Sequence, residues 1–429
     1  MRVLMFGWEF PPYISGGLGT ACCGLANGLS SIDGTKIIFV VPKVYGCEES
    51  HLIDLIGAGD IAITKKRISL TKFGQLIDYF EIQSKLVPYL QPDEYATSIS
   101  QTIENLKLLV ETDPEGKLKF TGQYGKDLFT EIARYAVVAD VIAQNQKFDV
   151  IHAHDWLTFP AGIAAKQRTG KPLIVHVHAT DFDRSGGQVN QDVYNIEKKG
   201  MMLADKVITV SNLTRKAVID KYGIHPDKVI TVYNAVEPFR YNIRTPVGKR
   251  FDDKIVTFLG RITTQKGPCY FVDVAKRILQ RMDNVRFVMA GCGDLMEEMI
   301  RRVAQLQISD KFHFAGFLKG SDVYRMFRMS DVFVMPSVSE PFGISPLEAM
   351  QAGVPVVISR QSGVAEILSH AIKTDFWDID GMSDAIHGIL KYPSLSGMLA
   401  KSGKAESGKL NWTDAAFKVN DIYKNLVFK

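Results

Sequence analysis

The sequence predicts an α/β protein built from two doubly wound, parallel-sheet domains that face each other across a cleft. First, short β-branched and apolar runs alternate with amphipathic helical stretches, the pattern of parallel sheets covered by helices. Second, this alternation occurs as two separate series along the chain. Third, a chain of 429 residues is too long for one ordinary hydrophobic core, so two domains are expected.

The first series predicts an N-terminal domain over residues 1–236. Several of its strands are nearly continuous apolar runs, as expected for strands buried on both faces. We expect these strands at Val3–Gly7, Lys36–Val41, Asp149–Ala153, Pro172–Val177, Lys206–Val210 and Lys228–Val232. Residues 85–134 break this rhythm with helix-forming and polar residues, and they predict a helical insertion. The insertion could be a docking place for a ligand or a pair of scaffold helices.

The second series predicts a C-terminal domain over residues 237–410. The boundary falls near residues 234–253, where Pro238, Pro246 and several charges interrupt the pattern. We expect strands at Lys254–Gly260, Val285–Ala290, Lys311–Ala315, Asp331–Met335 and Val354–Ile358. Residues 411–429 contain a closing helix, Trp412–Leu426, which could cross back to the first domain. Ligands of such sheets bind at the carboxyl ends of the strands, so the cleft is the expected site.

Charge and cysteine content narrow the class of protein. The chain has 51 basic and 47 acidic residues and a net charge of +4, which argues against nucleic acid as a main partner. Its five cysteines are odd in number and form no CxxC pair, which favours a reduced cytoplasm. No apolar run approaches the roughly 18 residues that a membrane span needs. Peripheral membrane contact and the oligomeric state stay open.

Two carboxylates frame a strand-to-helix turn in the second domain. Glu340 lies on the loop after the strand, and Glu348 lies about one turn into the helix that follows. The backbone N–H groups near Gly343 and Ile344 are expected to be free, because a helix leaves its first donors unpaired, and such donors attract phosphate. Residues 345–348 also form a Ser-Pro-Leu-Glu capping box, with Ser345 as the cap, so Glu348 could be structural, could bind ribose hydroxyls, or could do both.

Two loops that follow strands are candidate anion sites. The Gly-Gly-Leu-Gly loop at 16–19 precedes a helix expected to start near Ala21, and its glycines allow an anionic group to approach closely. A plain turn is the alternative. In the second loop, Arg261 and Lys266 flank a turn before Pro268, which suits a first helical position. Both cations can point at one diphosphate, although lone basic residues on a loop are often only solvated.

Four histidines follow or end two predicted strands of the first domain. They are His152, His154, His176 and His178. Alternation along a strand places His176 and His178 on one face. Together with Asp155 or Asp181 they could bind a metal, but they lie on separate strands and show no HExxH spacing. We therefore predict no metal and expect a polar cluster that faces a sugar.

These segments make the chain resemble the retaining nucleotide-sugar glycosyltransferases with two Rossmann-like domains, the GT-B architecture. It is similar to glycosyl transferases group 1 and glycosyltransferase family 4, close to the glycogen and starch synthases. The Glu-x7-Glu spacing of Glu340 and Glu348 is the most specific part of the resemblance. The Arg261-x4-Lys266 spacing, the Gly-Gly-Leu-Gly loop and the His-Ala-His-Asp-Trp run at 152–156 support it.

The resemblance implies a role for each candidate residue. Arg261 and Lys266 would hold the donor diphosphate, and Glu348 would bind the nucleotide ribose. Glu340 would bind the donor sugar, and His178 would lie beside its anomeric carbon. The implied catalytic residues are His178, Glu340, Arg261 and Lys266. The other implied contacts are the diphosphate at Gly16 and Gly17, phosphate and sugar hydroxyls at Gly343, Ile344 and Ser345, and the acceptor at Glu9 and Asp155.

The resemblance also implies a reaction. Residues 1–236 would bind the acceptor and residues 237–410 the nucleotide-sugar, and a hexosyl unit, glucose favoured, would be transferred with retention. Neither a metal ion nor a cofactor is implied. An α-glucan is the first expectation for the oligo- or polysaccharide acceptor, from the run at 152–156 and the Glu-Phe-Pro-Pro at 9–12. A lipid-linked or capsular saccharide as acceptor, and a nucleotide-sugar 2-epimerase in place of a transferase, stay open.

One departure from the family pattern concerns the nucleotide. Synthases that use ADP-glucose typically carry a lysine two residues before the paired glycines, where this chain has Ile14. The second domain also lacks an obvious acidic or aromatic residue to select the base. The sequence therefore leaves UDP, ADP and GDP open.

Overall fold

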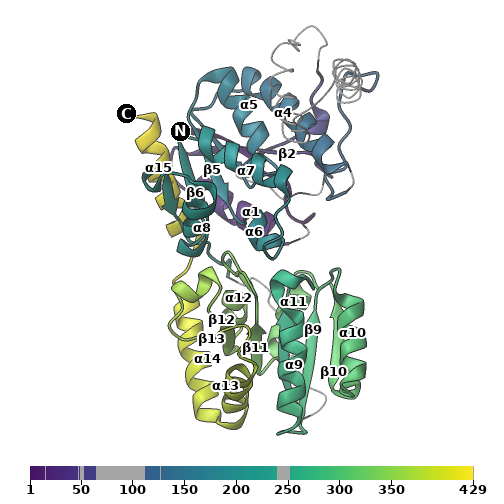
Figure 1. The fold of residues 1–429 in the computed structure, drawn as a ribbon. Coiled ribbons are helices and arrows are strands. Elements are labelled where there is room, and N and C mark those ends of the chain that lie inside the picture. Colours follow the sequence, from purple (N-terminus) through teal and green to yellow (C-terminus); the bar gives the residue numbers. More distant parts are fainter. Residues whose placement is uncertain are drawn as a thin grey trace.

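The computed structural model describes residues 1–14, 16–46, 48, 53–63, 112–125, 127–238 and 252–428. It contains two parallel sheets, of seven and six strands, each flanked by helices and arranged one above the other in Figure 1. The predicted fold class, two doubly wound α/β domains, is confirmed. None of the described helices combines the length and hydrophobicity that crossing a bilayer requires.

The first sheet has the strand order β3-β2-β1-β4-β5-β6-β7, and all neighbouring strands are parallel. The strands are β1 Arg2–Phe6, β2 Lys36–Val41, β3 Ile53–Gly57, β4 Val150–His154, β5 Leu173–Val177, β6 Lys206–Thr209 and β7 Val229–Thr231. Every predicted strand of this domain is present, whereas β3 was not predicted. It is an edge strand with one exposed and two half-buried residues, so it lacks a continuous apolar run.

The helices of this part of the chain are α1 Gly17–Ser30, α4 Leu128–Asn145, α5 Phe159–Thr169, α6 Asp181–Arg184, α7 Gln191–Leu203 and α8 Asn212–Tyr222. Short 3-10 turns lie at η1 Ala58–Asp60 and η3 Pro226–Lys228. Helix α1 begins at Gly17, earlier than the predicted start near Ala21. Side chains of β1 alternate between two cores, with Leu4 and Phe6 in one and Val3 and Met5 in the other.

Residues 112–125 correct part of the predicted helical insertion. They form turns and isolated antiparallel bridges, such as Ala62 with Lys117 and Thr112 with Leu118, and helix begins only at Leu128. Pro114 and several glycines in this stretch explain the absence of helix. Residues 85–111 of the predicted insertion lie outside the described residues.

The second sheet has the order β10-β9-β8-β11-β12-β13, again parallel throughout. The strands are β8 Lys254–Leu259, β9 Val285–Ala290, β10 Phe312–Gly316, β11 Val332–Met335, β12 Val356–Ser359 and β13 Ile372–Thr374. The predicted strands of this domain are all present. Only β13 was missed, because three residues at a sheet edge carry too little pattern to be recognised.

The helices around the second sheet are α9 Pro268–Leu279, α10 Met296–Gln305, α11 Ser321–Met329, α12 Ser345–Gln351, α13 Ile379–Lys391 and α14 Pro393–Ser407. The 3-10 turns are η4 Thr264–Lys266, η5 Ser309–Lys311 and η6 Gly363–Glu366. Pro268 occupies the start of α9, as predicted.

The chain ends on the first domain. Helix α15, Trp412–Val427, lies beside α1, and Figure 1 shows it at the same end of the molecule as the N-terminus. The two helices approach closely at Gly24, where a Cβ atom would lie 2.3 Å from the ring of Trp412. Further along α15, the hydroxyl of Tyr423 contacts Nδ1 of His152 on β4. The last helix thus forms part of the core that surrounds the histidines.

Candidate active site

The turn after β8 brings Lys266 to the end of β11. Lys266 ends the 3-10 turn η4, and Gly267 follows with φ +65°, a conformation that glycine adopts without strain. A Cβ atom at Gly267 would lie 2.2 Å from the carbonyl oxygen of Pro336, directly after β11. Only glycine therefore lets the β8 turn lie against the β11 loop, which is the loop that carries Glu340.

Glu340 is buried and pairs with Lys266. Nζ of Lys266 donates to Oε2 of Glu340, and the Ser337 hydroxyl lies 3.4 Å from the same oxygen. The backbone of Glu340 is fixed on both sides: its N–H donates to Gln361 (2.9 Å) and its carbonyl accepts from Gly363 (2.9 Å). The structure thus brings together two of the predicted catalytic residues at the carboxyl ends of neighbouring strands.

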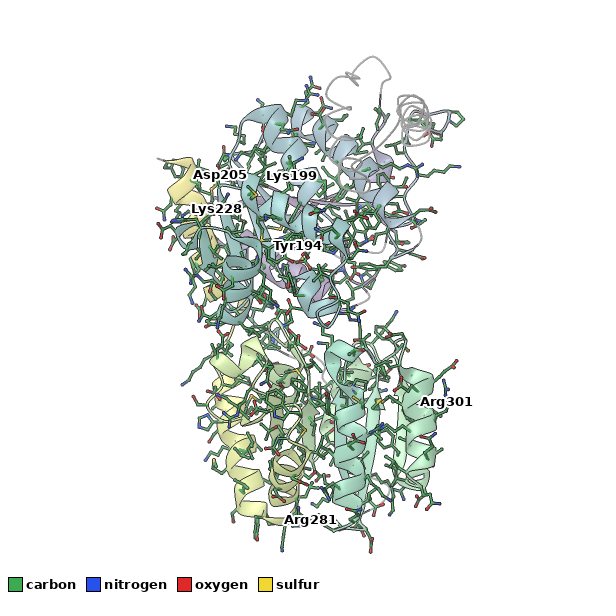
Figure 2. The ribbon with its side chains drawn as sticks, viewed as in Figure 1. Tyr194, Lys199, Asp205, Lys228, Arg281 and Arg301 are labelled. Carbon is green, nitrogen blue, oxygen red and sulfur yellow. The ribbon has the colours of Figure 1, made fainter. Side chains whose placement is uncertain are left out.

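Arg261 follows β8 and is exposed. Its Nη2 donates to the side-chain oxygen of Gln265 at 3.1 Å, so the guanidinium stays over the turn that carries Lys266. The two cations therefore lie on one loop, as the sequence predicted. By contrast, Figure 2 shows Arg301 on the outer helix α10 and Arg281 at the end of the second domain remote from the first.

The predicted capping box at residues 345–348 is wrong. Helix α12 starts at Ser345 itself, the residue before it is Ile344, and no side chain caps this end. Ser345 therefore lies inside the helix, and Glu348 is its fourth residue. Within the described part of the chain, the Glu348 carboxylate has no hydrogen-bond or ion-pair partner, and burial raises its pKa to about 7. The purely structural role considered for Glu348 is not supported.

The backbone before α12 offers unpaired donors. The N–H groups of Gly343, Ile344 and Ser345 donate to no described residue. Gly343 has φ +100°, in the left-handed region that favours glycine. These donors lie between Glu340 and Glu348 in the chain, as expected for a segment that contacts phosphate and sugar hydroxyls.

The four histidines form a stack on one face of the first sheet. The register pairs His154 of β4 with His176 of β5, and alternation then adds His152 and His178 to the same face. Ring centroids lie 4.3 Å apart for His152 and His154 and 4.4 Å apart for His176 and His178. Burial lowers the pKa of all four rings below the usual value, so they are neutral. The prediction that His176 and His178 share a face is confirmed.

The rings of His152, His154 and His176 do not converge on a metal position. One nitrogen from each of His152, His154 and His176 lies within 4.8 Å of the others. However, a metal lies close to the plane of every imidazole that binds it, and the planes of His152 and His154 are stacked at 22°. Two stacked planes share no such position, so these rings would have to turn before they could coordinate one ion.

Asp155 contacts the end of the histidine stack, and Glu9 lies at the start of α1. Asp155 follows β4, is buried, and its Oδ1 accepts the backbone N–H of His178 at 2.7 Å. Asp155 therefore positions the loop after β5. Glu9 is also buried, and a Cβ atom at Gly19 would lie 3.1 Å from its Oε2, which places Glu9 against the first turn of α1.

The start of α1 leaves room for a ligand. Gly16 precedes α1 in extended conformation, and Gly17 is its first residue. A Cβ atom at either position would meet nothing within 4 Å. This open space would allow the close approach of an anionic group that the sequence predicts.

Hydrogen bonds join the two domains next to both halves of the site. The Ser339 hydroxyl donates to Oδ1 of Asp183 at 2.6 Å, so the residue before Glu340 contacts the short helix α6, which follows His178 in the chain. A second contact lies at η6, where the Glu366 carboxylate accepts the N–H groups of Asn212 (2.9 Å) and Leu213 (2.7 Å) at the start of α8. The candidate site therefore straddles the domains.

Comparison with known proteins agrees with this architecture. Residues 239–406 match the family Glycosyl transferases group 1, and residues 119–240 match Glycosyltransferase Family 4. A glycosyltransferase of Methanocaldococcus jannaschii is 28% identical over 99% of this chain and 98% of its own. Glycogen synthase of Mycobacterium tuberculosis is 22% identical over 99% of this chain and 94% of its own. The structure of HepE of Anabaena, solved with UDP-glucose, superposes with a TM-score of 0.68 and 16% identity, and the match covers 99% of this chain and 100% of HepE. The chain is a GT-B glycosyltransferase.

Sequence reasoning missed three residues at the site of this GT-B glycosyltransferase. Asp183 and Ser339 make the contact between domains, and Asp183 also closes a capping box with Thr180 at the start of α6. The Thr-x-x-Asp spacing of that box was a signal that could have been used. The third residue is Phe317, an aromatic with 50% of its surface exposed at the carboxyl end of β10.

Phe317 belongs to the same edge of the sheet as Arg261. The carbonyl of Gly316 accepts the N–H of Gly291 at 2.7 Å, and Gly260 in turn donates its N–H to the carbonyl of Ala290 at 3.1 Å. The carboxyl end of β9 therefore contacts the ends of both β8 and β10. Phe317 follows β10, two strands away from Arg261 and Lys266, which follow β8. An exposed aromatic side chain is therefore present at this edge of the sheet.

Proposed function

We propose that this glycosyltransferase moves a hexosyl unit, glucose in the first instance, from a nucleotide-diphosphate sugar to an α-glucan acceptor. The reaction would proceed with retention and without a metal ion or cofactor. The observation that carries the proposal is the Lys266–Glu340 pair at the ends of β8 and β11, joined through Ser339 to the region of His178. In this arrangement a cation that can bind phosphate and a carboxylate that can bind sugar hydroxyls are in direct contact.

Donor binding would redistribute the contacts of this pair. In the free protein the Lys266 charge is neutralised by Glu340. A bound diphosphate supplies a stronger partner for Lys266 and for Arg261, and it frees the Glu340 carboxylate to accept hydroxyls of the donor sugar. The unpaired N–H groups of Gly343 and Ile344 would complete the contacts to phosphate and sugar.

The nucleotide end of the donor would lie further along the same edge. Glu348 has no partner among the described residues and is the nearest remaining carboxylate on this segment, so it suits the ribose hydroxyls. Phe317 is exposed and could stack on the base. The existence of HepE in complex with UDP-glucose supports a nucleotide-sugar as the donor.

The chemistry follows from charge development. The bond between the anomeric carbon and the diphosphate oxygen breaks, and its electron pair leaves with the phosphate. Lys266, Arg261 and the backbone donors stabilise this growing negative charge. The acceptor hydroxyl forms the new bond from the same face and passes its proton to the departing phosphate oxygen. A neutral His178 lies beside the carbon on which positive charge develops, so it adds no repulsion.

The acceptor would bind the first domain. A cavity of about 720 Å³ opens beside residues 112–134, which overlap the stretch expected to receive an acceptor, and Lys43, Phe120 and Glu131 are among its lining residues. The glycogen synthase relative supports a glucan. Glu9 and Asp155 would contact the acceptor.

The experiment is a thermal-shift panel with UDP-, ADP- and GDP-glucose, followed by product analysis with maltooligosaccharides. We expect one glucose donor to raise the melting temperature and the oligosaccharide to lengthen by α-linked units. No shift with any glucose donor would remove the glucan reading. Incubation with donor alone separates a 2-epimerase, which would yield an isomerised sugar without an acceptor. Transfer only to a lipid-linked or capsular saccharide would replace the acceptor and leave the donor assignment intact.

A further inference from the structure

Helix α6 connects the two halves of the candidate site. It is a single turn, Asp181–Arg184, that follows His178 in the chain, and Figure 1 shows it at the end of the first domain that faces the second. Within it, Oδ2 of Asp183 accepts the backbone N–H and the hydroxyl of Thr180, both at 2.8 Å. Oδ1 of the same carboxylate accepts the Ser339 hydroxyl at 2.6 Å. The position of α6 therefore sets where His178 lies relative to the second domain.

This turn cannot hold its position through its own backbone. A helix of one turn is unstable in isolation, because the cost of nucleation is not repaid by further hydrogen bonds. Residues 186–188, which follow α6, are exposed and belong to no helix or strand, so α6 does not continue into a regular element. Side-chain contacts must therefore fix the segment from His178 to Asp183.

Arg184, the last residue of α6, makes such contacts in two directions. Its Nη1 donates to the carbonyl of Ala179, directly after His178, at 3.1 Å. Its Nη2 donates to Oε1 of Glu197 on helix α7. The Glu197 side chain is buried, and its Oε2 accepts the hydroxyl of Tyr222 on α8. The guanidinium thus ties the residue after His178 to a buried carboxylate that is fixed between two longer helices.

Two further carboxylates lie beside the same cation. Oδ2 of Asp155 is 3.8 Å from Nη1 of Arg184, and Oδ1 of Asp181 is 3.8 Å from its Nε. Both carboxylates are buried, and buried charges are stable only when they are paired. Oδ1 of Asp155 accepts the backbone N–H of His178 at 2.7 Å. Asp155 therefore gives Arg184 a second connection to the backbone of His178.

The planar guanidinium suits this set of partners. Its two terminal nitrogens donate to Ala179 and to Glu197, and its centre lies 6.0 Å from the ring of Trp156. A lysine ammonium carries the same charge on a single nitrogen, so it cannot donate to both partners with the same fork geometry. Because these nitrogens donate to oxygens of the protein, the geometry suits Arg184 for positioning rather than for direct contact with a substrate.

We propose that Arg184 is a positioning residue for the transfer reaction: its guanidinium fixes the segment between His178 and α6, and thereby the place of His178 beside the donor sugar. The inference rests on the proposed function only for the role of His178 in transfer. A displacement of about 1 Å in a reacting complex can cost about 100-fold in rate. Loosening of this segment should therefore lower kcat, whereas the donor, held mainly by the second domain, should keep its KM.

The test compares Arg184→Lys, which keeps the charge but lacks the fork, with Arg168→Lys as its matched control. Arg168 is equally shielded, with 25% of its side chain exposed against 23% for Arg184, and its Nε and Nη2 both donate to Asp140. It lies near the end of α5, shortly before β5 begins, and so at the opposite edge of the sheet from His178. The control loses a comparable fork without touching the site.

Hydrogen exchange followed by mass spectrometry examines the segment itself, without any substrate. We expect the peptide that contains the N–H groups of His178 and Ala179 to exchange about fivefold faster in Arg184→Lys, the effect of losing one hydrogen bond. The same peptide should be unchanged in Arg168→Lys. Equal exchange of this peptide in the two variants overturns the proposal. Faster exchange throughout the first domain also overturns it, because Arg184 would then support the whole fold.

A second variant approaches the same contact from its other side. Glu197→Gln keeps the size of the side chain but removes the negative charge that holds Nη2 of Arg184. It should also speed exchange of the peptide that contains His178. This variant replaces Arg184→Lys if the lysine variant does not fold, and unchanged exchange of that peptide would then overturn the proposal.

Activity distinguishes this inference from the proposed function. We expect kcat to fall about tenfold or more in Arg184→Lys and to stay within about twofold in Arg168→Lys, with the KM for the donor little changed in both. If the segment loosens while kcat does not fall, the contacts of Arg184 stand and the proposed role of His178 in transfer fails. A fall in kcat without faster exchange overturns the inference, and so does a rise in the donor KM in place of a fall in kcat.

Discussion

Lys266 and Glu340 form an ion pair although 74 positions separate them in the chain. The pair joins the turn after β8 to the loop after β11, and only 20% of the Lys266 side chain and 8% of the Glu340 side chain is exposed. A charge shielded to this degree destabilises the fold when its partner is removed. We therefore expect loss of the pair to lower the stability of the fold, and loss of Lys266 to weaken binding of the donor phosphate.

The first prediction concerns stability. Lys266→Ala and Glu340→Ala should each lower the free energy of unfolding, and the double variant should lose less than their sum, with a coupling of about 1–2 kcal/mol. Urea unfolding of the four proteins measures this coupling. The exposed pair Arg301–Glu297, with 73% and 89% of its side chains exposed, is the matched control. Its coupling should not exceed about 0.5 kcal/mol, and an equally small value for Lys266–Glu340 would contradict the prediction.

The second prediction concerns transfer. Replacing Arg261 or Lys266 by alanine should lower kcat/KM by about 100-fold or more, because each removes a cation from the departing diphosphate. Initial rates with the glucose donor found in the thermal-shift panel provide the measurement. Arg281→Ala is the control, since Arg281 lies at the far end of the second domain, where it pairs with Asp384. Full activity of either site variant, with the control unchanged, would mean that the phosphate assignment is wrong.

The strands that carry the site could be predicted from sequence, but the contacts between them could not. Apolar runs placed Glu340 and Lys266 after strands. Their pairing, however, depends on β8 and β11 being neighbours in the sheet order, which no local pattern encodes. Likewise, alternation predicted one shared face for His176 and His178, whereas the register that aligns His154 with His176 appears only in the folded sheet.

The errors of prediction also have physical causes. The capping box failed because the helix starts one residue earlier than a capping serine requires, with Pro346 already inside its first turn. Residues 112–125 were assigned to a helical insertion although glycines and Pro114 interrupt them. The aromatic after β10 was overlooked because Phe317 alone shows no pattern. Its exposure, and hence its interest, is a property of the fold.

The third prediction concerns the contact between domains at Glu366. Its carboxylate accepts the first N–H groups of α8 and also the hydroxyl of Tyr233, at 2.8 Å. A carboxylate at a helix start stabilises it, so Glu366→Ala should lower the free energy of unfolding by about 1 kcal/mol. Urea unfolding measures the loss, and Glu297→Ala, near the start of α10, is the control. Equal losses in the two variants would show that the hydrogen bonds of Glu366 add nothing to the general effect of a carboxylate at a helix start.

The fourth prediction tests Phe317 as a base contact. Phe317→Ala should weaken nucleotide binding by about tenfold, which is the lower part of the range for loss of one stacked base. Phe317→Tyr should retain most of the affinity, because it keeps the ring. Calorimetric titration with the matching nucleoside diphosphate separates these cases. If alanine and tyrosine bind alike, the base lies elsewhere.

The fifth prediction is a pH dependence that arises at Glu348. Burial raises the pKa of this carboxyl to about 7, so in the free protein it is largely protonated at pH 6 and largely ionised at pH 8. Ribose hydroxyls donate to the ionised form, so binding favours loss of the proton. Nucleotide affinity should therefore rise by up to about tenfold from pH 6 to pH 8. This gain should disappear as the pH falls through 7 and the carboxyl becomes protonated.

Glu348→Gln isolates this carboxyl from every other titrating group. The amide has nearly the same shape but does not ionise, so the variant should bind more weakly at pH 8 and show little change in affinity between pH 6 and pH 8. Titration with a nucleoside diphosphate at both pH values supplies the four affinities needed. The phosphate itself titrates near pH 6 to 7, and this contribution is common to both proteins and cancels in their ratio. If the ratio of the wild-type affinity to the Glu348→Gln affinity is the same at pH 6 and pH 8, Glu348 does not bind the ribose.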